Sequence, residues 1–146
     1  MALRIRPAQL AQLEDVAQAH FRDSIVRHLL QNHGRAPVRV EGADTHLAEL
    51  RPELLQTMVA SALARGRAHG LHEARALTAF AVLSVLVAPT FDLYPEIAAA
   101  LKQDATPPDE CMEAITTSMT DADWEAVRAV SEPDAWDAAL KAARAG

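Results

Sequence analysis

The sequence predicts an all-α fold, a single-domain bundle of about six or seven helices around a central apolar helix near residues 73–87. Alanine, the strongest helix former, supplies 31 of the 146 residues, whereas glycine supplies only five. The middle of the chain is uncharged and almost wholly apolar, and in the flanking segments apolar residues recur every three or four positions. This length fits one domain, so we expect residues 1–146 to fold as one unit.

The first predicted helix begins at Pro7, because proline lacks only an N–H that the first turn leaves unused. Gly34 marks its end. Between them, apolar residues follow in steps of three and four, which we interpret as one stripe that faces the core. The stripe consists of Leu10, Leu13, Val16, Ala17, Phe21, Ile25 and Leu29.

Residues 35–50 interrupt the helical pattern with several turn formers. Valines alternate with Arg39, which suggests a short extended piece, but no partner strand is evident. We therefore predict a loop that closes with a helical turn at 45–50.

The second long helix is predicted from Pro52 to the stop at Gly70. Gly66 lies inside it, where glycine costs about 1 kcal/mol relative to alanine. We expect a close approach of another helix, or a bend, at that position.

The central helix is predicted from His72 or Glu73 to Val87, and Pro89 ends it. From Ala76 onward it reads ALTAFAVLSVLVA. A helix without a polar face is buried on all sides, so we expect the other helices to pack around it.

Short helices are predicted in the rest of the chain, and residues 104–146 are acidic. Thr106 is the expected N-cap of one of them, with Pro107 at its first position and Asp109 as an acid in its first turn. Thr120 and Asp123 have the spacing of a capping box. Three of the four predicted helices cover about 95–102, 107–118 and 121–130, and the last opens within residues 131–134 and runs to about Ala143.

The charge is unevenly distributed. Residues 1–75 carry ten bases and eight acids, a net +2, whereas residues 76–146 carry four bases and twelve acids, a net −8. An acidic half disfavours nucleic acid as a partner, because phosphates require a basic surface. The acids are suited to a basic protein partner, although solubility alone also explains them and is the interpretation we favour.

The expected location is the cytoplasm. Cys111 is the only cysteine, so no internal disulfide can form, which is typical of a reducing compartment. The N-terminal residues lack the apolar segment of a signal peptide. The longest uncharged run is too short for a membrane span, which needs about 20 residues.

Neither a catalytic centre nor a metal site is evident, and we expect no enzyme activity and no cofactor. His20 and His28 are about 12 Å apart along the first helix, too far to share a metal ion. Cys111 follows two acids, which oppose formation of a thiolate. Glycine-rich phosphate loops and nucleophile elbows are also lacking.

Cations cluster around the end of the second helix. A phosphate or carboxylate could bind there, against the turn at 91–95, although helix capping and surface charge explain the cluster more simply, and we favour that explanation. The anion-binding candidates are Arg65, Arg67, His69 and Arg75, with His72 beside them.

Most of the few aromatic residues lie in the turn at 91–95 and in the C-terminal helices. They either bury themselves against the core, the alternative we favour, or anchor a partner protein. The partner-binding candidates are Phe91, Asp92, Tyr94, Trp124 and Trp136.

Three groups of residues resemble a motif set of small, all-helical bacterial proteins encoded near type VI secretion effector and toxin clusters. Residues 35–50 look like an insertion relative to that family, and Glu96 and Ile97 replace its aromatic residues after the turn. The matching residues are Arg6, Gln9, Leu10 and Phe21, then Arg67, Gly70 and Leu71, then Phe91, Asp92 and Pro95.

The resemblance implies an accessory protein, and it supplies no catalytic residue. We therefore expect a non-catalytic protein that binds a secreted effector, toxin or spike component as adaptor, chaperone or neutraliser. Two alternatives remain open. One is a small-molecule or anion-binding domain, or an enzyme, that uses the corner from Arg65 to Arg75. The other is a homo-oligomeric structural module built on the first helix.

Overall fold

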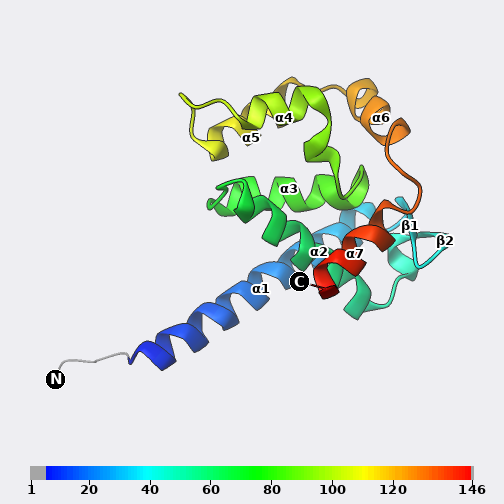
Figure 1. Cartoon of the computed structure of the whole chain (residues 1–146). Coiled ribbons are helices and arrows are strands. Elements are labelled where there is room, and N and C mark those ends of the chain that lie inside the picture. Colours follow the sequence, from blue (N-terminus) through cyan, green and yellow to red (C-terminus); the bar gives the residue numbers. More distant parts are fainter. Residues whose placement is uncertain (1–5, 146) are drawn as a thin grey trace.

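The computed structural model describes residues 6–145, and this part of the chain is mostly helical (Figure 1), which confirms the all-α class. The first five residues and Gly146 of the predicted domain lie outside the described residues. The α-helices are α1 (Pro7–His33), α2 (Pro52–Ala68), α3 (Ala74–Leu86), α4 (Pro95–Leu101), α5 (Pro108–Ser118), α6 (Asp121–Ala129) and α7 (Ala135–Ala145). The other elements are the strands β1 (Pro37–Val40) and β2 (Ala43–His46) and the 3-10 turns η1 (Leu47–Glu49) and η2 (Phe91–Leu93).

Helix α3 lies at the centre, as predicted. It packs most extensively on α2 and also contacts α1, α5 and β1. Figure 1 shows α3 between a layer of α4 and α5 and a layer of α1 and α2. No residue in 76–92 is exposed, and Phe80 and Ala81 are completely buried. The apolar run therefore forms the middle of the core, and the helices around it position all the surfaces described below.

Gly66 lies at a close contact between α2 and α3. A Cβ atom on Gly66 would lie 3.2 Å from Cδ2 of Leu77 and 3.3 Å from Cδ1 of Phe80. These distances are shorter than ordinary van der Waals contacts, so the absent side chain lets the two helices meet. The predicted close approach at this glycine is confirmed.

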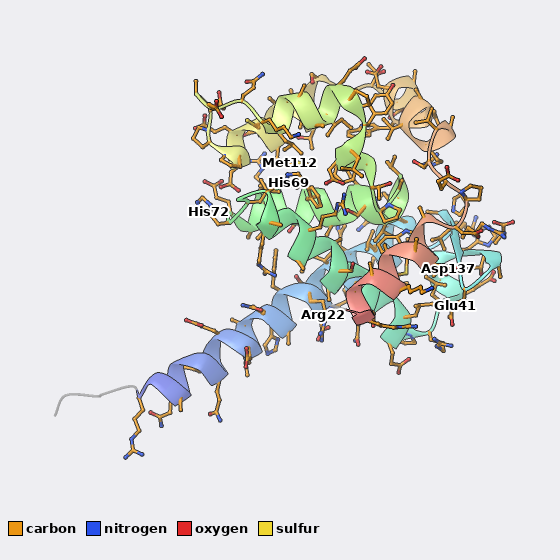
Figure 2. All side chains as sticks on the ribbon, in the orientation of Figure 1. Arg22, Glu41, His69, His72, Met112 and Asp137 are labelled. Carbon is orange, nitrogen blue, oxygen red and sulfur yellow. The ribbon has the colours of Figure 1, made fainter. Side chains whose placement is uncertain are left out.

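The predicted loop at 35–50 is wrong for eight of its residues, because β1 and β2 form an antiparallel hairpin there. Both residues of its tight turn have positive φ, 53° at Glu41 and 72° at Gly42, as a type I′ turn requires. The carboxylate of Asp137 accepts hydrogen bonds from the backbone N–H groups of Glu41 and Gly42, at 2.6 and 3.0 Å. Figure 2 shows Glu41 and Asp137 side by side where α7 meets the hairpin.

The predicted apolar stripe of α1 is not one face of the helix. Ile25 and Leu29 are buried, but Leu13 and Val16 are 55% and 54% exposed. Leu13 and Leu29 are 16 positions apart, so at about 100° per residue they lie about 160° apart around the helix axis. We call residues 7–20 the arm, because this half of α1 projects beyond the rest of the described chain (Figure 1).

Two of the predicted helix starts have different outcomes. The N-cap of α5 is Pro107 rather than Thr106, so that prediction is off by one residue. The capping box of α6 is confirmed: the Asp123 N–H donates to Thr120 Oγ1 at 3.2 Å, and the Thr120 N–H donates to Asp123 Oδ2 at 2.8 Å.

Asp109, at the start of α5, acts on another helix. Its Oδ1 accepts hydrogen bonds from the backbone N–H groups of His72 and Glu73, both at 3.1 Å, and so satisfies donors at the start of α3.

Within the described residues, no helix combines the length and the apolar character that a membrane crossing requires.

Candidate functional site

The turn η2 and the end of α2 meet at a buried carboxylate. Asp92 is 1% exposed, and Arg65 Nε lies 2.8 and 2.9 Å from its two oxygens. His69 Nε2 lies 2.6 Å from Asp92 Oδ2. Arg65 and His69 are four residues apart, one helical turn, so both point at the same partner. The structure thus brings together two anion-binding candidates and one partner-binding candidate of the sequence analysis.

This pairing changes what the cationic corner can do. The side chains of Arg65 and His69 face the protein's own carboxylate, which needs hydrogen-bonding partners because it is buried. Arg67 and Arg75 are exposed and form no ion pair with any described residue. They line different grooves, of about 290 and about 160 Å³, so the four candidates do not form one site.

An aromatic chain connects this cluster to the core. The ring centroids are 5.7 Å apart for His69 and Phe80, 4.8 Å for Phe80 and Phe91, and 6.2 Å for Phe91 and Trp124. Such spacings are typical of favourable tilted and edge-to-face contacts. The cluster therefore fixes η2 against α2 and α3.

Reaction chemistry at the cluster would require a second reacting group. Among residues 6–145, no hydroxyl or thiol hydrogen-bonds to His69, and no three His, Cys, Asp or Glu side chains gather where they could hold a metal ion. The buried thiol of Cys111 lies 3.7 Å from the carbonyl oxygen of Thr106, in another part of the fold.

The five partner-binding candidates do not form a surface patch. Phe91, Asp92 and Trp136 are buried, so they are not available on the surface of the folded chain. Tyr94 and Trp124 are half-buried and pack against the core. This is the self-burial that the sequence analysis favoured.

Two large apolar side chains, Leu13 and Val16, are exposed next to each other on the arm, whereas Leu30, Leu93 and Val130 are exposed singly elsewhere in the described chain. Figure 2 shows the side chains of the arm standing away from the rest of the described chain. Where the arm joins the other helices, a groove of about 290 Å³ separates α1 from the corner between α2 and α3. The groove is lined by Ala17, Gln18, Phe21, Arg67, Leu71, His72, Ala74 and Leu77.

Sequence reasoning missed this groove, although a signal was present. Two of its apolar residues, Ala17 and Phe21, belong to the predicted stripe of the first helix, but only the three-dimensional course of α1 shows that the helix leaves the other elements there. From Ala17 onward the apolar residues recur every four positions, and each such step rotates the stripe by about 40° around the helix axis. This rotation was the available clue.

A second groove, of about 320 Å³, lies between β1, the end of α3 and the segment that joins α6 to α7. Its cations already have partners. Arg39 pairs with Asp44 at 3.3 Å and with Asp134 at 3.1 Å, and Arg128 donates to the carbonyl oxygen of Leu86 at 2.7 Å. This groove therefore presents mainly apolar atoms.

A comparison of the chain with protein-family models, with curated proteins and with solved structures found no match.

Proposed function

We propose that this chain is a non-catalytic accessory protein that binds another protein through the arm and the groove at its base. The observation that carries the proposal is the exposure of Leu13 and Val16 on a helix that projects from the other elements. Apolar side chains grouped on a projecting helix are typical of helix-mediated recognition.

The groove indicates the chemistry of the partner. Phe21, Leu71 and Leu77 supply apolar atoms, and Arg67 supplies a cation without an ion-pair partner among the described residues. An amphipathic helix with one acidic side chain beside its apolar face suits such a groove. The resemblance noted above points to an effector, toxin or spike component of type VI secretion, bound by an adaptor, chaperone or neutraliser.

The Asp92 cluster supports a structural rather than a catalytic role for the histidine-containing corner. Asp92 is saturated by Arg65 and His69, and the His69 ring packs against Phe80. A catalytic histidine needs a free nitrogen within reach of a reacting group, and the cluster supplies no such group from the described side chains.

Anion binding is the alternative function. It would have to use Arg67 or Arg75 singly, because they line different grooves. A thermal-shift screen with phosphates and carboxylates tests it. A shift that Arg67→Ala abolishes would favour this alternative over protein binding.

The proposal is tested by co-purification of the tagged full chain with the products of neighbouring genes. Leu13→Glu places a charge on the arm, whereas the control Val130→Glu places one on an apolar side chain that is 71% exposed and directly follows α6. We expect the wild type and the control to retain the same partner and Leu13→Glu to lose it. Equal retention by all three, or no specific partner for the wild type, contradicts the proposal.

A further inference from the structure

We infer that a second copy of the chain binds the arm and its groove, with the two arms antiparallel about a two-fold axis near Ala17. This inference rests on the proposed function, because the second copy occupies the same surface while the partner protein is absent and is displaced when the partner binds. Three features support it: the spacing of residues along α1, the opposite charges of the arm and the groove, and the position of the other helices.

The spacing places a leucine over the groove. Leu13 and Phe21 each lie four residues from Ala17, which is about 6 Å along the helix axis on either side. In an antiparallel pair centred on Ala17, Leu13 of the second copy therefore lies level with Phe21, which lines the groove. Alanine at the crossing point allows the two backbones to approach closely. The two-fold axis makes the same contact twice.

The charges are complementary. Glu14 follows Leu13, is exposed and forms no ion pair with a described residue. Arg67 on the groove is likewise exposed and unpaired among residues 6–145. When Leu13 of one copy enters the groove of the other, the adjacent Glu14 comes with it to the groove that Arg67 lines. Each two-fold pair then contains two such ion pairs.

The position of the other helices selects the antiparallel orientation. All elements after α1 lie at one end of the arm (Figure 1). In a parallel pair, the elements after α1 of both copies would lie side by side at that end. In an antiparallel pair, they lie at opposite ends of the paired arms. Because only the arms and two grooves are in contact, the interface is small, and we expect a weak dimer with a dissociation constant between about 1 µM and about 1 mM.

The test is sedimentation velocity of the full chain from low concentration up to about 1 mM, the upper end of that range. We expect the wild type to show a monomer–dimer equilibrium. Leu13→Glu should weaken the dimer at least tenfold, and the control Val130→Glu should leave it unchanged. The altered side chains are exposed, and far-UV circular dichroism confirms that each variant is folded.

A charge exchange identifies the contact. Glu14→Arg and Arg67→Glu should each weaken association, and the double variant should restore it, because every intermolecular pair again joins opposite charges. A chain that stays monomeric up to about 1 mM overturns the inference, as does a dimer that Leu13→Glu leaves intact or a double variant weaker than both single ones. If the chain is monomeric but Leu13→Glu still abolishes partner co-purification, the proposed function stands and only the second copy is excluded.

Discussion

Removal of the guanidinium of Arg65 should destabilise the fold more than neutralisation of the carboxylate of Asp92. In Arg65→Met the apolar stem is kept, but Asp92, which is 1% exposed, retains only His69 as a partner. Loss of one partner of a buried ion pair costs about 3–5 kcal/mol. The Arg65 side chain is itself 36% exposed, so solvent screens part of the pair. We therefore expect about 3 kcal/mol, at the lower end of that range.

Asp92→Asn removes the charge but keeps the size and one oxygen that can accept from Arg65. Hydrogen bonds to charged groups contribute about 1.5–3 kcal/mol, so we expect a loss of about 2 kcal/mol. The double variant Arg65→Met/Asp92→Asn lacks both the guanidinium and the carboxylate, so neither charge is left without its partner. Its loss should be smaller than the sum of the single losses by at least about 1 kcal/mol.

Urea unfolding followed by tryptophan fluorescence measures these free energies, because Trp136 is buried and Trp124 packs against Phe91. The m-values should be unchanged, and the Tm of Arg65→Met should fall by about 6–12 °C. A loss below about 1 kcal/mol for Arg65→Met, or strict additivity in the double variant, would refute the reasoning that Asp92 is a buried charge held by its partners.

Three further predictions follow from the packing and the helix starts. Gly66→Val should cost about 1–3 kcal/mol by overpacking the contact between α2 and α3, and an unfolding free energy equal to that of the wild type would show that the helices can separate. Asp137→Ala should accelerate amide hydrogen exchange at Glu41 and Gly42, which donate to that carboxylate, and unchanged exchange would exclude this anchor. The backbone N–H of Thr120, and then its hydroxyl, lower the pKa of Asp123 below its usual 3.8. This contribution to stability is therefore present above about pH 4 and is lost as the pH falls through the lowered pKa. The loss of stability caused by Asp123→Asn, measured against the wild type, should therefore shrink below about pH 4. A loss that stays constant down to about pH 2 would contradict this prediction.

The helices were predictable because their signals are local. Prolines at the first position of α1, α2 and α4, and the capping box at Thr120, mark helix starts through the backbone donors of a single turn. The central helix was equally clear, since a helical run without charged residues and without a polar face indicates burial. In each case the information lies within a few adjacent residues.

The hairpin and the arm were not predictable by the same reasoning. The turn has Glu41 at a positive φ, which is unusual for glutamate, and the carboxylate that holds it comes from α7. Leu13 is exposed because the other helices do not extend along α1 as far as this residue, and no local sequence pattern predicts where their contact with α1 ends. The sequence brought Arg65, His69 and the turn at 91–95 together as one candidate region, but the identity of the bound anion, Asp92, required the structure.

The contacts of Asp137 with Glu41 and Gly42 have a consequence for the order of folding. They join residues 96 and 95 positions apart, so the tip of the hairpin obtains its anion only after residue 137 has left the ribosome. Until then the two positive-φ residues have no carboxylate to hold them, and the hairpin should open and close freely. We expect α7 to complete a substructure that is encoded near the beginning of the chain, so that its docking is a late step of assembly.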